Sequence, residues 1–162
     1  MATIGGLPIT RNGHDYLFVV VNRFNEMCIL MHCKNTINGQ EVTNKFFEQV
    51  WVHFGIPRSI ISDRDTKFLD AFWTTLWENM DTKLKWSTKF HLQTHGKIEV
   101  VNRTLVQLLR GYNQKHPKTL DENTLYNQRS YSRAVCTSTD KSPFKTCFGY
   151  FLLSPLDVFF VK

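Results

Sequence analysis

The chain has 162 residues, of which 42% are hydrophobic and 14% aromatic, so it is about one domain long and too apolar to be disordered. Its formal net charge of +6 favours a nucleic-acid partner, although other basic soluble proteins share such a surplus. No apolar run reaches the roughly 18 residues of a membrane span and no signal peptide is visible, so we expect an intracellular protein, nuclear or cytoplasmic, without membrane contact. Four cysteines without CxxC spacing predict reduced thiols, not a disulfide framework.

The first half of the chain predicts a hairpin, a helix and a third strand. Residues 15–23 and 27–33 are short apolar runs rich in β-branched and aromatic residues, and the short gap between them favours a hairpin. Between residues 39 and 54 apolar side chains recur at helical spacing, and the Gly-Ile-Pro that follows ends the predicted helix. Residues 58–62 predict a short strand that ends at Asp63.

The second half predicts a strand between two helices and a further short helix near the end. Apolar residues between 68 and 80 mark one helix, residues 83–88 alternate like a strand, and a stripe between 98 and 112 marks another helix. Ser142 and Pro143 are typical of a helix start. This order predicts a single α/β domain over residues 1–157, with a mixed sheet and a tail at 158–162. Sites in such sheets collect at the carboxyl ends of strands, where Asp63 is placed.

Glu99 is the one acid in a basic stretch. The cations between residues 83 and 118 are Lys83, Lys85, Lys89, Lys97, Arg103, Arg110, Lys115 and Lys118. Helical geometry turns Glu99 away from the apolar stripe, so it is not a core residue. A solvated glutamate, or an acid that the helix dipole favours, would explain it, just as a turn aspartate would explain Asp63. Two carboxylates converging among cations are also what a divalent-metal site beside a phosphate backbone needs.

Four segments carry a resemblance to a known family. They read GLPITRNGHDYLFVVVNRF, FGIPRSIISDRDTKF, HLQTHGKIEVVNRTL and KSPFKTCFGY. Together they resemble the integrase catalytic core of long-terminal-repeat retrotransposons of the Ty3/gypsy type, over residues 1–157. Thirty-five residues separate Asp63 from Glu99, which matches the D-D-35-E pattern of that family.

The resemblance implies a ribonuclease-H-like fold, a five-stranded mixed sheet flanked by helices. It also implies Mg²⁺ or Mn²⁺ ions held by three carboxylates, and DNA integration by metal-dependent phosphoryl transfer. Asp63 would be the second carboxylate and Glu99 the third. The implied partners are element ends and target DNA, with a possible homodimer. The implied nucleic-acid contacts are His91, Gln93, Lys97, Asn102, Arg103 and Arg110.

The chain departs from the family at the first acid. Where the family reads M-D-F-I-x-G-L-P, this sequence reads MATIGGLP, so Ala2 replaces the aspartate and Thr3 the phenylalanine. An alanine has no oxygen for a metal, so we expect weakened metal binding and impaired catalysis. Asp65 is not expected to substitute, because it should point away on its loop. The chain begins inside the segment of the first strand, which we expect to be truncated.

Three functions remain open. The chain could be an active polynucleotidyl transferase, a non-catalytic DNA-binding module of integrase descent, or a decayed mobile-element fragment. The Asp63–Glu99 interval favours the first, the basic stretch the second, and the replaced acid the third. His32 and Cys33 are adjacent on a predicted strand and so point to opposite faces, which predicts packing residues and not metal ligands.

Overall fold

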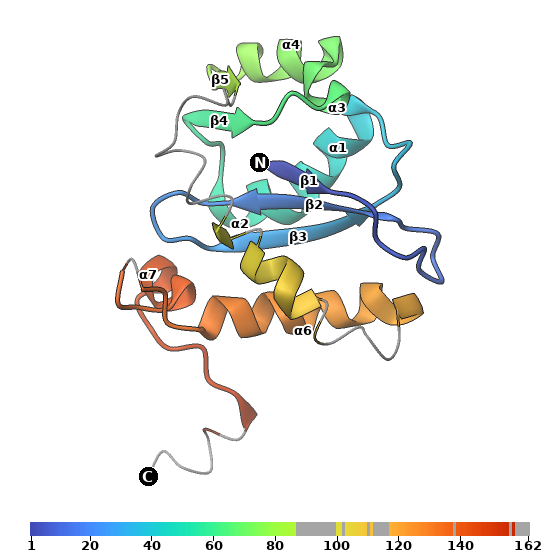
Figure 1. Ribbon diagram of the computed structural model, residues 1–162. Coiled ribbons are helices and arrows are strands. Elements are labelled where there is room, and N and C mark those ends of the chain that lie inside the picture. The colour runs from blue at the N-terminus through green and yellow to red at the C-terminus, as the bar shows by residue number, and fades with distance from the viewer. Residues whose placement is uncertain are drawn as a thin grey trace.

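The computed structural model describes residues 1–86, 100–101, 103–109, 111, 117–137, 139–155 and 157, and Figure 1 shows their arrangement. A central sheet has helices on both faces. β2 (Tyr16–Val21) and β3 (Cys28–Cys33) form an antiparallel hairpin, which confirms the prediction, and β1 (Ala2–Ile4) pairs antiparallel with β2. In β2 and β3 alternate side chains face opposite ways, so each face of the hairpin buries its own apolar cluster.

The other two strands lie beyond β1. β4 (Ser59–Ser62) pairs parallel with β5 (Lys83–Trp86), and both strands were predicted. Across the described residues the five strands form a three-stranded antiparallel sheet and a two-stranded parallel sheet. The Met1 amine donates a hydrogen bond to the Ile61 carbonyl oxygen, so β1 lies between β2 and β4. This arrangement brings the end of β4 beside β1.

One face of the hairpin packs on α1 and on α4 (Ala71–Asn79). The predicted helix over 39–54 is present as α1 (Gly39–Phe46), the π-helical η1 (Phe47–Trp51) and α2 (Val52–Phe54). Asn38 and Glu41 form a capping box at its start. Phe46 meets Trp77 edge to face, with ring centroids 5.0 Å apart.

The helix predicted between residues 68 and 80 is wrong as one continuous element. The structure has α3 (Thr66–Leu69) and α4 (Ala71–Asn79), and the break falls at Asp70. Asp70 is extended and its side chain accepts a 2.8 Å hydrogen bond from Phe72 N, so it caps α4 instead of continuing α3. The break leaves Phe72 partly exposed, while Trp73 and Trp77 stay buried.

The opposite face of the hairpin packs on the helix of residues 100–111, described except for 102 and 110, and on α6 (Leu120–Arg133). Val101, Leu105 and Leu109 are buried there, which confirms that part of the predicted stripe. α6, which the sequence did not predict, follows η2 (Pro117–Thr119) and covers the free edge of β3, where Gln128 Oε1 accepts a hydrogen bond from Leu30 N. α7 (Pro143–Phe148) begins at the predicted Ser142 cap. None of the described helices is long and apolar enough to cross a membrane.

Candidate active site at the end of β4

Asp63 follows β4 directly and lies half-buried against β1. Its Oδ1 accepts a 3.3 Å hydrogen bond from Asp65 N, and the Thr3 backbone also bonds to it. Burial raises the pKa of the Asp63 carboxyl, and the neighbouring Asp65 adds to the rise, against the opposing hydrogen bonds and the Met1 amine. The predicted site residue is therefore where the strand order placed it, with its charged form disfavoured.

β1 brings Ala2 and Thr3 to this position. Ala2 pairs with Val19 of β2, so the residue at the expected place of the first acid is fixed within the sheet. Its side chain is a methyl group, which offers no oxygen to a metal. The Thr3 hydroxyl donates a 3.0 Å hydrogen bond to Asp65 Oδ2. The strand is in the right place for a carboxylate cluster but contributes no carboxylate.

Asp65 points toward β1, and the expectation that it points away on its loop is wrong. It caps α3 by accepting from Lys67 N at 3.2 Å, and the Lys67 ammonium lies 3.4 Å from Oδ2. Burial raises the pKa of Asp65, but the bonds from Lys67 N and the Thr3 hydroxyl and the Lys67 ammonium together lower it below its ordinary value. Asp65 is thus held as a structural anion.

Lys67 is the residue of this site that sequence reasoning missed. Its side chain is buried, and its ammonium lies 4.9 Å from the centroid of the Tyr16 ring. The Tyr16 ring packs directly against Gly5. A side chain at Gly5 would clash with it, because a Cβ there would lie 2.5 Å from the tyrosine ring. An aspartate at a helix start is typical of an N-cap, so the sequence could have predicted the capping role of Asp65. The burial of Lys67 beside it is visible only in the fold.

The described side chains do not by themselves fit a two-metal centre. Ala2 offers no oxygen, and the Asp65 carboxylate is already matched by Lys67. Within the described ranges, no group of three His, Cys, Asp or Glu side chains is arranged to hold a metal ion. Because Mg²⁺ prefers several oxygen ligands in octahedral geometry, Asp63 alone is not a sufficient anchor.

Several predicted site residues lie outside the described part of the chain. They are His91, Gln93, Lys97, Glu99, Asn102 and Arg110. The approach of Glu99 to Asp63 therefore stays a prediction.

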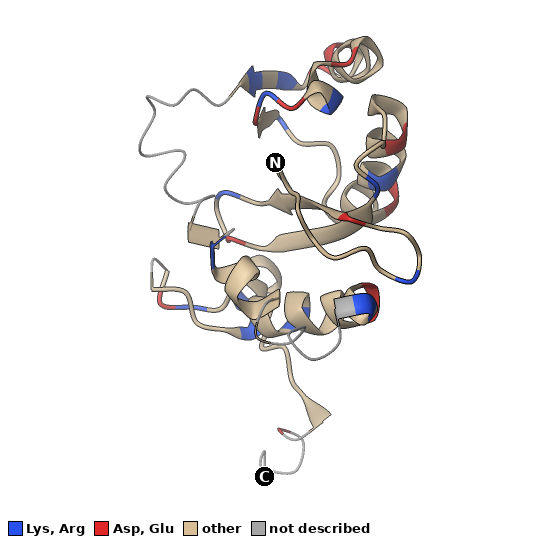
Figure 2. Ribbon diagram, turned by 45° about the vertical axis from the view of Figure 1, so that its right-hand side comes forward, with Lys and Arg blue, Asp and Glu red and all other residues tan. Residues whose placement is uncertain are grey.

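Arg103 is described and exposed on the helix of residues 100–111. Lys83 and Lys85 are exposed on β5, where the ribbon of Figure 2 carries the blue of basic residues.

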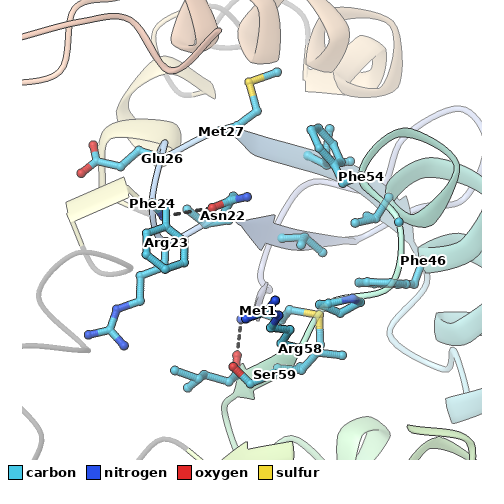
Figure 3. A pocket seen from close by; sticks show the side chains of 18 of the residues that line it. Met1, Asn22, Arg23, Phe24, Glu26, Met27, Phe46, Phe54, Arg58 and Ser59 are labelled. Atoms are coloured by element: carbon cyan, nitrogen blue, oxygen red, sulfur yellow. Dashed lines mark hydrogen bonds between the residues drawn. The ribbon is translucent and has the colours of Figure 1, made fainter. Parts of the chain in front are cut away.

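A cavity of about 440 Å³ lies between the β2–β3 turn and the start of β4. Figure 3 shows Phe46 and Phe54 on one side of it and Arg23 and Phe24 on the other, with Met1 projecting between them. Asp63 does not line this cavity, because it lies at the opposite end of β4. The candidate active site is therefore a surface at the strand end and is separate from this hollow.

Comparisons with known proteins give the class of fold. No family model matches the chain. The simian T-cell lymphotropic virus intasome structure, in complex with PP2A regulatory subunit B56 gamma, aligns with a TM-score of 0.75 at 17% identity, covering 94% of this chain and 55% of that one. The magnesium-bound HTLV-2 integrase catalytic core, in its trimeric form, aligns with a TM-score of 0.67 at 18% identity, covering 88% and 99%. The fold is that of a retroviral integrase catalytic core, so the ribonuclease-H-like prediction is confirmed.

Sequence relatives identify the lineage. The Transposon Tf2-3 and Tf2-4 polyproteins of Schizosaccharomyces pombe (strain 972 / ATCC 24843) are each 34% identical over 159 residues, which is 98% of this chain. The chain belongs with the integrase catalytic cores of Ty3/gypsy-type retrotransposons, as the sequence motifs indicated. It spans 12% of the length of these polyproteins.

Proposed function

We propose that this chain is a DNA-binding integrase-core domain whose phosphoryl-transfer activity is impaired. The observation that carries the proposal is the contact between Asp63 and β1. The strand that should supply the first carboxylate lies against Asp63 but presents Ala2 and Thr3. The hydroxyl of Thr3 bonds to Asp65, which Lys67 already neutralises, so neither residue replaces the lost acid.

A divalent metal is proposed from the magnesium-bound HTLV-2 core, with Asp63 and Glu99 as the ligands in this chain. In phosphoryl transfer, such metals activate the attacking oxygen and neutralise charge on the phosphate. Two carboxylates provide less negative charge and fewer oxygens than three, so we expect weak binding of Mg²⁺ or Mn²⁺. A displacement of a reacting group by about 1 Å can cost on the order of a hundredfold in rate.

DNA binding is supported by the net charge of the chain and by the positions of its exposed basic residues. The chain carries a formal charge of +6, and the exposed Lys83 and Lys85 lie on β5, which pairs with β4, the strand that Asp63 follows. Arg103 adds a cation on the helix of residues 100–111. His91, Gln93, Lys97, Asn102 and Arg110 remain proposed contacts. The intasome and the oligomeric cores among the structural neighbours support DNA and a second copy of the chain as partners.

Fluorescence anisotropy with a labelled DNA duplex tests this function. We expect the affinity to fall steeply between low and moderate salt, because phosphate contacts release counterions. A double Lys83→Gln and Lys85→Gln variant should bind more weakly and with a smaller salt slope. The matched control replaces Lys34 and Lys141, two exposed lysines elsewhere, and should bind like the wild type apart from a small effect of net charge. A flat salt response in the wild type would contradict the proposal.

A further inference from the structure

Asp121, at the start of α6, gathers polar side chains from two segments far from it in the chain, the turn of residues 10–14 and β3. Its Oδ2 accepts hydrogen bonds from Thr10 Oγ1 at 2.8 Å and from Asn12 Nδ2 at 2.9 Å, and it lies 3.2 Å from His14 Nδ1. Its Oδ1 lies 3.1 Å from Nδ1 of His32, a residue of β3. The site described above uses none of these groups.

The segment of residues 10–14 is shaped for this contact. Thr10 N donates to the His14 carbonyl oxygen and His14 N donates to Thr10 Oγ1, which closes a tight turn. Arg11 N also donates to the Lys118 carbonyl oxygen just before α6. The turn is therefore fastened to the start of α6 through both backbone and side chains.

A count of hydrogens shows that the cluster is one proton short when His32 is neutral. His32 Nε2 lies 2.6 Å from Thr124 Oγ1, Thr124 Oγ1 lies 2.8 Å from the Leu120 carbonyl oxygen, and His32 Nδ1 faces Asp121 Oδ1. These three contacts need three hydrogens, but a neutral imidazole and one hydroxyl supply two. His32 Nδ1 and Asp121 Oδ1 are also the two atoms of this set that are buried without a geometrically sound hydrogen bond.

We propose that His32 and Asp121 form a proton-sensitive clamp that fastens β3 and the turn of residues 10–14 to α6. The clamp takes up its missing proton between His32 Nδ1 and Asp121 Oδ1 on acidification. That proton completes the hydrogen bonds, but it also places a cation in a largely buried position. His32 was predicted to be a packing residue, and the structure adds polar contacts with Thr124 and Asp121. Its neighbour Cys33 lies in the core.

The charges around His32 set the direction of the effect. Burial lowers the pKa of His32, Asp121 opposes this, and His14 and Lys45 of α1 add to the lowering. A histidine whose pKa is lower in the folded than in the unfolded chain stabilises the fold fully above about pH 6.5 and loses that contribution as the pH falls. The fold should therefore be less stable in mild acid than at neutral pH, because the unfolded chain takes up the proton more readily than the buried imidazole does.

Urea unfolding between pH 8 and pH 5 tests the clamp with a matched pair of variants. In the wild type we expect the unfolding equilibrium constant to rise below about pH 6.5, by at most about tenfold per pH unit for one proton. His32→Gln should lose this component, while His53→Gln, an exposed histidine of α2, should keep it. The Met1 amine, whose pKa burial lowers to about 6, titrates in the same range, so only the difference between the two variants is assigned to the clamp.

Imidazole ¹⁵N spectra of the unmodified protein keep the test decisive if His32→Gln does not fold. One histidine should titrate with a midpoint below the ordinary value of about 6.5. Equal pH slopes in the two variants, or a folded protein in which all histidines titrate at ordinary values, would overturn the proposal. Thermal stabilisation by added Zn²⁺ that disappears in His32→Gln would also overturn it, since the cluster would then be a metal site.

Discussion

The hydroxyl of Thr3 bonds to the carboxylate of Asp65 at 3.0 Å, and this contact joins β1 to the cap of α3 across 62 positions of sequence. The same carboxylate holds the buried ammonium of Lys67. The two elements that flank Asp63 are therefore fastened together by side chains of the protein itself. This fastening is compatible with a fold that stays intact whether or not a metal binds beside it.

Replacing Asp65 by alanine should destabilise the fold by about 2 kcal/mol or more, because α3 loses its cap and Lys67 is left buried without its anion. Urea unfolding at pH 7 measures the change. Lys67→Met in the Asp65→Ala background should recover part of the loss, since the unpaired buried charge is removed. Equal stabilities of the single and double variants would show that the pair is not a stabilising contact.

Asp63→Asn should leave the free energy of unfolding unchanged or raise it, by at most about 1 kcal/mol. The pKa of Asp63 is raised in the folded protein, so its charged form costs stability, and this cost develops as the pH rises above the ordinary carboxyl pKa. The amide removes that cost and keeps the shape. Asp140→Asn, at an exposed turn, is the control. A clear loss of stability in Asp63→Asn alone would mean that the carboxylate has a structural role.

Trp77→Ala should cost about 3–5 kcal/mol, because the indole is fully buried against Phe46 and Trp73. Trp77→Phe should cost clearly less. The Nε1 atom of Trp77 is buried without a hydrogen-bond partner, so the phenyl ring loses volume but no polar contact. Thermal unfolding of both variants beside Trp51→Phe, which changes an exposed ring, gives the comparison. Equal losses in the two Trp77 variants would contradict this reasoning.

Ala2→Asp should create a response to Mn²⁺ that the wild type lacks. A second carboxylate beside the half-buried Asp63 should lower the melting temperature without metal, because two like charges are brought together. Added Mn²⁺ should then raise it, by more than in the wild type. Ala2→Asn is the control that adds a side chain of the same size without charge. An Mn²⁺ response equal in all three proteins would count against this placement of the site.

The sequence predicted the hairpin, the strands around the site and the position of Asp63, because short β-branched apolar runs, alternation and turn residues report local structure directly. It missed the break at Asp70, since the apolar spacing continues across the residue that caps α4. It missed α6, because the helix is mostly polar and several of its buried residues are polar too, so no apolar stripe marks it. It also missed the Thr3–Asp65–Lys67 contacts and the cluster around Asp121, because these join residues from segments far apart in sequence.

A strand-transfer assay with labelled element-end DNA and Mn²⁺ tests the central claim most directly. The account predicts that the wild-type chain binds the DNA in a salt-dependent manner but yields no strand-transfer product, because Ala2 leaves the metal site without its first carboxylate. Binding and the absence of product should be measured in the same samples, so that a failure to bind is not mistaken for a failure of chemistry. Clear Mn²⁺-dependent product from the wild type, abolished by Asp63→Asn, would contradict the account and identify an active enzyme.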